Sequence, residues 1–262
     1  MTYPKPLPNI MVAPNGARRT KADHSAIPLT QPELVETAIA CQAAGADGIH
    51  LHIRDAEGLH LLDVAGYARL LDALSAAVPD MYLQVTSEAA GRYMADEQIA
   101  IVRALKPDHV SVALREMVPS PEAWPAAQAF YHWAADKDVS IQHILYAPEE
   151  VALFLDAVSA GRIPGTHHLL QFVLGDYQGT RISRPEDIEP LLDLLAGAGS
   201  GHTFDWMLCA FGREETGCLT EAARLGGKVR VGFENSLWNA DGSLAADNAE
   251  RVREVSGAIH AL

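Results

Sequence analysis

Short apolar runs rich in Val, Ile and Leu alternate along the chain with longer segments in which apolar residues recur at helical spacing. This alternation predicts strands that are each followed by a helix. Strands are predicted near residues 9–14, 48–54, 81–87, 109–114, 139–146, 167–174, 203–210 and 228–234. Their starts lie about 31 residues apart on average, which is the length of one strand–helix unit.

Helix starts are visible between the predicted strands. Segments 30–33 (TQPE) and 183–186 (SRPE) both match a capping box. Eight strand–helix units in about 250 residues are typical of a (β/α)₈ barrel, which we predict as one domain over residues 1–262. A doubly wound open sheet is the alternative, but no G-x-G-x-x-G follows the first strand. In a barrel, reacting groups lie at the C-terminal ends of the strands, so polar residues there are the candidates.

The strand predicted over 48–54 carries polar residues at alternate positions. With a side-chain period of two, His50, His52 and Arg54 face the barrel axis, whereas the apolar residues between them face the helices. Two imidazoles two residues apart on one face suit the chelation of one metal ion. The alternative is a pair of hydrogen-bonded barrel histidines.

The last predicted strand, 228–234, places Arg230 and Glu234 inward. In a closed barrel this strand and the strand over 48–54 both neighbour the first strand, so their side chains can converge. His50, His52 and Glu234 then form a His₂Glu set, which leaves zinc an open coordination position. An Arg230–Glu234 ion pair is the alternative. Because four residues of extended strand span about 13 Å, we expect no direct contact between the two side chains.

A loop of basic residues follows the first predicted strand. Arg18, Arg19 and Lys21 form a local cluster of cations that suits a phosphate or a carboxylate at the barrel mouth. Gly16 offers an unusual backbone angle there. An ordinary basic surface cluster is the alternative.

The strand over 81–87 ends in Thr86, Ser87 and Glu88. A hydroxyl and a carboxylate at this level of the mouth are suited to orient or deprotonate a substrate. Alternatively, they cap the next helix.

Charge and composition exclude several partners. The 20 Lys and Arg residues face 34 Asp and Glu residues, a formal charge of −14, which disfavours nucleic acid and anionic membrane surfaces. No apolar stretch approaches the roughly 20 residues of a membrane span, and no secretory signal is visible. Three cysteines are too few and too scattered for a disulfide framework. We therefore expect a cytoplasmic protein that acts on a small molecule.

Three motifs together resemble the β-keto acid cleavage enzymes, whose founding activity is 3-keto-5-aminohexanoate cleavage. These are 13–18 (APNGAR), 50–55 (HLHIRD) and 230–235 (RVGFEN), so the resemblance covers nearly the whole chain. It implies a zinc-dependent acyltransferase that converts a β-keto acid and acetyl-CoA into acetoacetate and a new acyl-CoA. It also implies a homotetramer.

The resemblance assigns residues to roles. It places zinc on His50, His52 and Glu234, the family's arginine on Arg230, and its hydroxyl on Thr86 or Ser87. The candidates for binding substrate or CoA are Asn15, Arg18, Arg19, Lys21, Arg54 and Asn235.

Two positions depart from the founding enzyme. Asn235 stands where that enzyme has an aspartate thought to share in proton transfer, and an amide accepts no proton at neutral pH. Glu88 is therefore the expected proton acceptor. Arg18 stands where a glutamate helps to recognise the substrate's ammonium. This exchange of charge predicts a β-keto acid that is uncharged or bears a carboxylate.

Two other functions compete with this one. An amidohydrolase-type metal-dependent hydrolase also uses an H-x-H strand, although that class usually places the pair on the first strand and an aspartate on the last. A non-catalytic metabolite-binding barrel is the second alternative.

Overall fold

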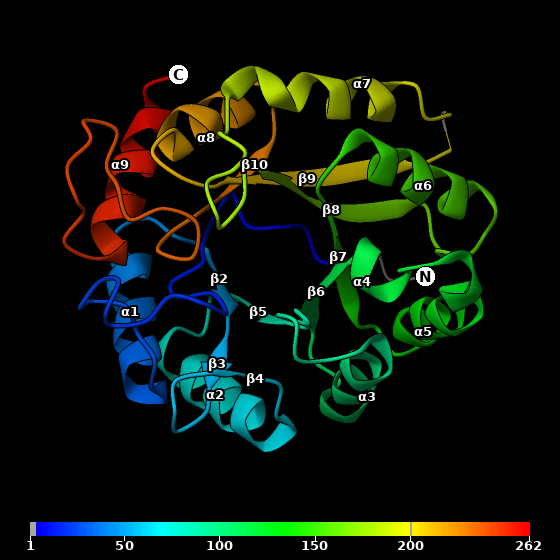
Figure 1. The fold of residues 1–262 in the computed structure, drawn as a ribbon, viewed down its shortest axis with the longest axis horizontal. Helices are drawn as coiled ribbons and strands as arrows, with labels where there is room; N and C mark the ends of the chain where they lie inside the picture. The colour runs from blue at the N-terminus through cyan, green and yellow to red at the C-terminus, as the bar shows by residue number, and fades with distance from the viewer. Residues whose placement is uncertain (1–3, 200) are drawn as a thin grey trace.

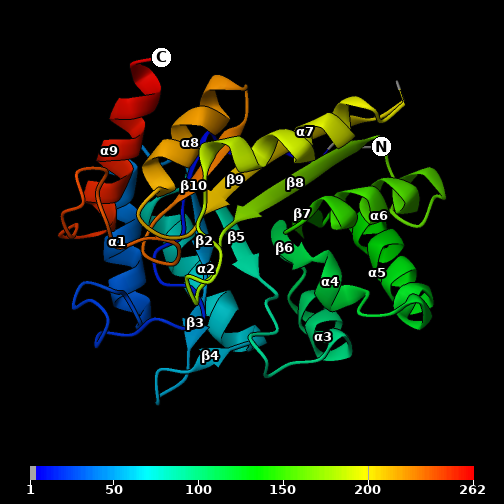
Figure 2. The same ribbon diagram turned by 45° about the horizontal axis from the view of Figure 1, so that its top comes forward.

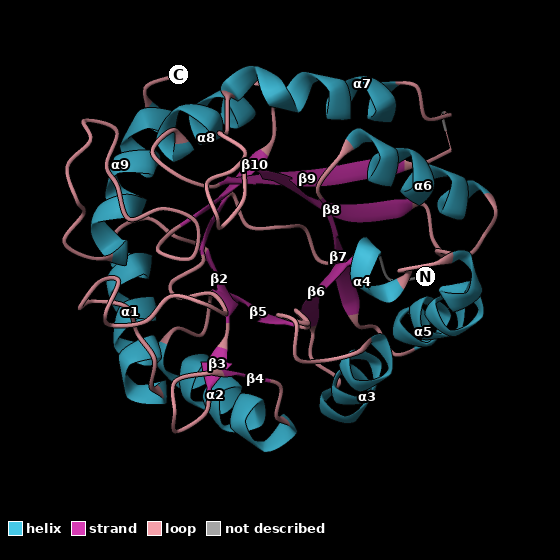
Figure 3. Cartoon of the chain, viewed as in Figure 1, coloured by secondary structure: helices cyan, strands magenta, loops and turns pink. Residues whose placement is uncertain are grey.

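The computed structural model describes residues 4–199 and 201–262. Residues 1–3, part of the N-terminal stretch without a visible secretory signal, and residue 200 lie outside the described residues. Eight parallel strands close a barrel (Figure 3), which confirms the predicted fold class. Around the ring they are β1 (Ile10–Val12), β2 (Gly48–Leu51), β5 (Tyr82–Thr86), β6 (His109–Ala113), β7 (Ser140–Leu145), β8 (His167–Leu174), β9 (Thr203–Ala210) and β10 (Lys228–Val231).

Helices surround the ring of strands (Figure 1). They are α1 (Gln31–Ala43), α2 (Val64–Ala77), α3 (Ala95–Leu105), α4 (Leu114–Met117), α5 (Trp124–Asp136), α6 (Pro148–Ser159), α7 (Glu189–Ala196), α8 (Glu215–Arg224) and α9 (Asn248–His260), with 3₁₀ turns η1 (Pro121–Ala123) and η2 (Pro185–Ile188). Within the described ranges, none of these helices has the length and apolar character needed to cross a membrane.

One of the two predicted capping boxes forms. The Thr30 hydroxyl accepts a hydrogen bond from the Glu33 N–H, and the Glu33 carboxylate accepts one from the Thr30 N–H. The capping box expected at Ser183 is wrong, because η2 is capped one residue later, at Arg184. The Ser183 hydroxyl donates instead to the Phe211 carbonyl, 2.8 Å away.

The strand predicted over 48–54 is divided. Ile49 and Leu51 of β2 pack into the apolar layer between sheet and helices, as the period of two predicts. The barrel strand ends at Leu51, and β3 (Ile53–Arg54) pairs antiparallel with β4 (His60–Leu61). This hairpin lies outside the ring, beyond the end of β2 (Figure 2). His52 therefore lies at the junction between barrel and hairpin.

The last barrel strand also ends earlier than predicted. After Val231 the chain turns: Gly232 has φ of +138°, and the Asn235 N–H donates to the Gly232 carbonyl at 2.8 Å. A Cβ at Gly232 would lie 2.6 Å from the Ala13 carbonyl oxygen, so only glycine fits this close approach. The turn brings Glu234 back over the barrel mouth.

Apolar residues fill the barrel at its N-terminal end and line one side of its mouth. Leu7, Met11, Tyr82, Leu169 and Met207 form the lower cluster. A second cluster, at the C-terminal ends of β6 to β9, contains Ala113, Ile144, Val173, Cys209 and Phe211. The polar residues near β2, β5 and β10 thus face an apolar wall across the mouth.

Candidate active site

A cavity of about 400 Å³ opens at the C-terminal ends of the strands. Six predicted site residues line it: Arg18, His50, Thr86, Glu88, Arg230 and Glu234. On the opposite side, apolar residues of the cluster at the mouth line it together with the charged residues Arg115, Glu116 and Arg181. A cavity with both apolar and charged lining suits a small organic acid.

His50, His52 and Glu234 converge at the edge of this cavity, with one ligand atom of each within 4.8 Å of the others. The two Nε2 atoms lie 3.1 Å apart, and Glu234 Oε2 lies 3.4 Å from His52 Nε2 and 3.8 Å from His50 Nε2. Ligand atoms about 2.1 Å from one tetrahedral ion lie about 3.4 Å from each other. The geometry therefore fits a divalent ion.

Outer partners orient both imidazoles. His50 Nδ1 lies 2.8 Å from Gln84 Oε1, so the proton on Nδ1 is donated there and Nε2 presents its lone pair. His52 Nδ1 lies 3.4 Å from His60 Nδ1, and His60 Nε2 lies 2.9 Å from the Glu88 carbonyl. Such contacts fix the rings of metal-binding histidines.

Glu234 is bonded through one oxygen only. Its Oε1 accepts hydrogen bonds from the Arg230 guanidinium at 3.0 Å and from the Tyr177 hydroxyl at 3.3 Å. Its Oε2 accepts no hydrogen bond of normal geometry from the described residues and faces the imidazoles. The expectation that Arg230 and Glu234 do not touch is wrong, because the turn after Val231 shortens the span between them.

Charges in the cluster suit metal binding. Burial alone would raise the pKa of Glu234, but Arg230 and the two imidazoles outweigh it and hold this pKa well below its ordinary value. Burial lowers the pKa of His50 to about 3, against the opposing effect of Glu234. Near neutral pH the carboxylate is therefore ionised and the His50 ring is neutral, which are the forms that bind metals.

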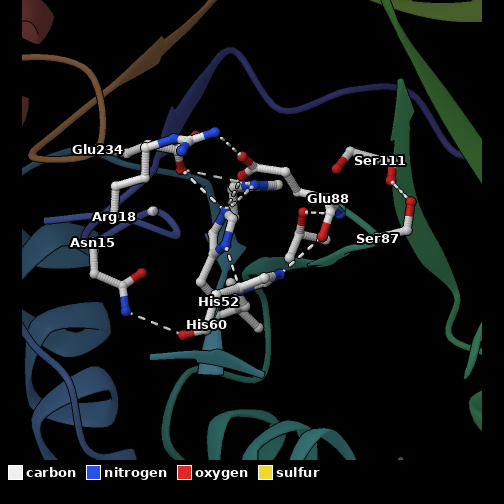
Figure 4. A network of polar contacts seen from close by, with 12 residues as sticks. Asn15, Arg18, His52, His60, Ser87, Glu88, Ser111 and Glu234 are labelled. Carbon is white, nitrogen blue, oxygen red and sulfur yellow. Dashed lines mark hydrogen bonds and ion pairs between the residues drawn. The ribbon is translucent and has the colours of Figure 1, made fainter. Parts of the chain in front are cut away.

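Glu88 contacts both Arg18 and His52 of the cluster (Figure 4). Its carboxylate oxygens are 3.9 Å from His52 Nε2 and 3.8 Å from the Arg18 guanidinium. Burial raises the pKa of Glu88, and the nearby Glu234 and Glu116 carboxylates add to the shift, although His52 and Arg18 oppose it. A carboxylate with a raised pKa at a cavity wall is suited to accept a proton.

The two candidate hydroxyls point in different directions. Thr86 lines the cavity, and its Oγ1 accepts a hydrogen bond from the Glu88 N–H at 3.0 Å. Ser87 is buried, and its hydroxyl donates to the Ser111 carbonyl at 2.9 Å. Thr86 is therefore the one of the pair that is placed to meet a ligand.

The basic cluster after β1 is dispersed. Arg18 lines the cavity, with its guanidinium 5.1 Å from the centre of the Tyr177 ring. Arg19 donates to the Phe233 and Asn235 carbonyls, at 2.6 and 3.4 Å. Lys21 forms an ion pair with Glu33 at 2.7 Å, outside the cavity. The structure thus brings one of the three cations to the cavity and uses the others to hold the loops.

Three other binding candidates also hold the loops. Asn15 donates to the Pro28 carbonyl at 2.9 Å and to the His52 carbonyl at 3.1 Å, the second of which is drawn in Figure 4. Arg54, expected to face the barrel axis, instead donates to backbone carbonyls of the 15–19 loop and to the Gly58 carbonyl. Asn235 is fully buried, and its side-chain amide has no partner among the described residues. None of the three lines the cavity.

Sequence reasoning missed several residues at the site. Gln84 lies two residues before Thr86 on the same strand, so the period of two already placed it on the inner face. His60 and Tyr177 lie in the hairpin and in the loop after β8, where no periodic pattern exists to place them. Gly16 has φ of +59°, which confirms its expected backbone angle.

Fold and site together define a (β/α)₈ barrel with a candidate metal centre at its mouth. The sequence model of the β-keto acid cleavage enzymes matches residues 9–262, so the chain belongs to this enzyme family. The resemblance found from the motifs is thereby confirmed.

Characterised relatives extend over most of the chain. A 3-oxoadipate:acetyl-CoA acetyltransferase from Cupriavidus necator is 27% identical, and the match covers 94% of this chain and 86% of the relative. A 3-keto-5-aminohexanoate cleavage enzyme from Acetoanaerobium sticklandii is 26% identical, with 92% and 87% covered. Both relatives are matched over nearly the whole barrel.

The fold is also shared with solved structures. The apo structure of ObcA superposes with a TM-score of 0.69 at 14% identity, over 88% of this chain. The matched region spans 61% of that longer chain. At this identity the likeness shows the barrel fold alone.

Proposed function

We propose that the protein transfers the acyl group of a β-keto acid to CoA: a β-keto acid and acetyl-CoA give acetoacetate and a new acyl-CoA. The β-keto acid gives up its C1–C2 fragment, which becomes part of acetoacetate, while its remaining acyl group forms the new thioester. The relatives named for 3-oxoadipate and 3-keto-5-aminohexanoate support this reaction class. A cytoplasmic location and a homotetrameric state stay predictions, and light scattering of the purified protein tests the second.

The convergence of His50, His52 and Glu234 beside Arg230 carries the proposal. A divalent metal held by these ligands, which we propose is zinc, supplies an electrophile that polarises a keto oxygen. The unpartnered Glu234 Oε2 and the Gln84 contact to His50 fit this use.

The remaining roles follow from position. The Arg230 Nε is buried without a partner among the described residues, so this guanidinium retains a donor for a carboxylate or a developing oxyanion. Glu88 accepts the proton from the carbon that becomes nucleophilic, which its raised pKa favours. Thr86 orients the substrate through its hydroxyl. The apolar wall across the mouth limits access of water to the thioester.

In this proposal Arg18 selects substrates by the charge at their distal end. Its side chain is about half exposed, at 53%, and projects along the cavity wall. A cation there favours a second carboxylate and disfavours an ammonium. The Cupriavidus necator relative is named for 3-oxoadipate, a β-keto acid with a second carboxylate. We therefore propose a carboxylate-bearing or uncharged β-keto acid as the substrate.

The test is a panel of β-keto acids assayed for acetoacetate with and without acetyl-CoA. The panel includes 3-oxoadipate, the uncharged-chain 3-oxohexanoate and 3-keto-5-aminohexanoate. We expect acetyl-CoA-dependent acetoacetate from the first or second. Consumption of a β-keto acid without acetyl-CoA, with no acetoacetate formed, would instead support the hydrolase, and no turnover of any member would support a binding barrel.

Charge reversal at Arg18 tests the selectivity. The variant Arg18→Glu is expected to lower kcat/KM for 3-oxoadipate by about 10²-fold and to raise it for 3-keto-5-aminohexanoate, because a like charge replaces an attractive one. Arg115→Glu, another arginine of the cavity lining, is the matched control. If both variants change the ratio equally, Arg18 has no special role in selection.

A further inference from the structure

The loop between β8 and η2 is held in shape by its own side chains. The Asp176 carboxylate accepts hydrogen bonds from the backbone N–H groups of Thr180 and Arg181, at 2.9 and 3.0 Å. The Arg181 guanidinium returns a hydrogen bond to the Gly175 carbonyl at 2.8 Å. This closed turn presents the residue after Asp176, Tyr177, to the cavity from a defined position.

Tyr177 contacts three parts of the mouth at once. Its ring lies against Phe211, with ring centroids 4.4 Å apart, and the Arg18 guanidinium lies 5.1 Å from the ring centroid. Its hydroxyl donates to Glu234 Oε1 at 3.3 Å. A Cβ placed on Gly16 would lie only 3.1 Å from this hydroxyl, so the loop after β1 packs closely on the same group.

The contact with Glu234 determines which carboxylate oxygen is free. Arg230 and Tyr177 both donate to Oε1, from different elements of the barrel. Two donors on one oxygen oppose rotation of the carboxylate about its terminal bond. The other oxygen, Oε2, is therefore kept facing the imidazoles of His50 and His52.

We propose that Tyr177 is a positioning residue with two functions: its hydroxyl fixes Glu234 as a one-oxygen metal ligand, and its ring supports Arg18 over the cavity. The first function concerns this chain's own metal affinity. The second rests on the proposed function, in which Arg18 meets the distal carboxylate of the substrate. Tyr177 thereby connects the metal centre with the part of the cavity that selects the substrate.

Removal of the hydroxyl alone tests the first function. In Tyr177→Phe we expect the affinity for Zn²⁺, measured by competition with a chromophoric chelator, to fall about 10-fold, as for other outer partners of metal ligands. The visible spectrum of the Co²⁺ form is expected to change, because a freed carboxylate binds with altered geometry. Tyr131→Phe removes another buried hydroxyl, one that does not line the cavity, and should change neither quantity.

Removal of the ring tests the second function. In Tyr177→Leu, KM for the best carboxylate-bearing β-keto acid should rise about 10-fold, because Arg18 loses its cation–π support. In Tyr177→Phe this KM should stay within about 2-fold of the wild type, since the ring is retained. A purely structural loop residue would give no such separation between metal affinity and KM.

The outcomes separate this inference from the proposed function. If the wild-type protein binds no Zn²⁺ and turns over no β-keto acid, the proposed function fails. If the wild type does both, but Tyr177→Phe keeps wild-type Zn²⁺ affinity and the wild-type Co²⁺ spectrum, the role of the Tyr177 hydroxyl is overturned and the proposed function stands. If KM in Tyr177→Leu stays at the wild-type value, the role of the ring is overturned and the proposed function again stands.

Discussion

Two buried glutamates adjoin the turn that follows β10, and each is bonded to an arginine: Glu234 lies within the turn, and Glu215 accepts a hydrogen bond from its first residue, Gly232. Arg230 donates to Glu234 at 3.0 Å, and Arg251 donates to Glu215 at 2.7 Å. Both oxygens of Glu215 are satisfied, because the second accepts the Gly232 N–H at 3.3 Å. The second oxygen of Glu234 faces two imidazoles instead.

The surroundings of the two carboxylates shift their pKa values in opposite directions. Burial raises the pKa of Glu215 to about 7, although Arg251 opposes the shift. Arg230 and two imidazoles overcome burial at Glu234 and lower its pKa. A buried carboxylate whose two oxygens are both hydrogen-bonded fixes the backbone, whereas one that keeps an oxygen free is prepared for a ligand.

Hydrogen bonds from several elements hold the turn after β10, which carries Glu234 and contacts Glu215. Asn248 accepts the Phe233 N–H at 2.9 Å and donates to the Pro14 carbonyl at 3.0 Å, so it ties the turn to the loop after β1. The Arg19 guanidinium donates a hydrogen bond to the Phe233 carbonyl of the same turn. Glu215, Asn248 and Arg19 thus fix the backbone from which Glu234 projects.

Loss of the ligand carboxylate should have the largest effect. In Glu234→Gln we expect kcat/KM to fall by roughly 10³-fold or more, because the amide carries no charge to hold the metal. Glu215→Gln is the matched control and should keep activity within about 3-fold, since Glu215 touches no ligand atom. Equal losses of kcat/KM in Glu234→Gln and Glu215→Gln would show that the Glu234–Arg230 and Glu215–Arg251 pairs do not differ in function.

Breaking the structural pair should reduce stability instead. Arg251→Met leaves Glu215 buried without its cation and removes the contact to Glu254. We expect the free energy of unfolding to fall by about 3 kcal/mol in urea titrations. The folded fraction should still bind metal. If Arg251→Met kept its stability but lost its metal, the Glu215–Arg251 pair would serve metal binding and not the fold.

The pH dependence of the free energy of unfolding should reveal the contribution of Glu215. Its pKa in the folded protein is about 7, above the ordinary 4.5, so the folded form holds the proton more tightly. Its contribution is complete below about pH 4.5 and is lost as the pH rises through about 7. Glu215→Gln stays neutral, so wild type should lose on the order of 3 kcal/mol relative to this variant over that range. A constant difference between the two unfolding curves would contradict the shift.

Loss of the Asn248 side chain, which connects the turn after β10 to the loop after β1, should have the smallest effect on stability and metal affinity. Asn248→Ala leaves the Phe233 N–H unpaired in the interior, which costs about 1–2 kcal/mol of stability. Metal affinity, measured by chelator competition, should fall only a few-fold, because Arg19 and Glu215 still hold the turn. An undiminished melting temperature would show that Asn248 does not tie the turn.

Most strands of the barrel could be predicted, because the alternation of apolar and polar residues along the chain follows directly from strand geometry. The eight predicted strands match the barrel strands in place, and His50 and Glu234 were placed on the inner face. Periodicity fails where a strand ends. The ends after Leu51 and Val231 depend on a hairpin and on a glycine in an unusual conformation. The first end moved Arg54 away from the barrel axis, and the second brought Arg230 into contact with Glu234.

The loops could not be predicted from charge alone. Arg18, Arg19 and Lys21 look equivalent in sequence, but tertiary partners give them different uses: the cavity, the turn after β10 and Glu33. Tyr177 gave no signal, because its position depends on the Asp176 turn rather than on a repeating pattern. Irregular segments are specified by contacts distant in the chain, which no local pattern contains.

Elemental analysis of the purified protein is the most direct test of the metal centre. We expect about one equivalent of zinc per wild-type chain and per Glu215→Gln chain, and less than about a tenth of an equivalent in His50→Ala, His52→Ala and Glu234→Gln. Equal zinc in all five proteins, or a metal-free wild type with full activity, would contradict the account.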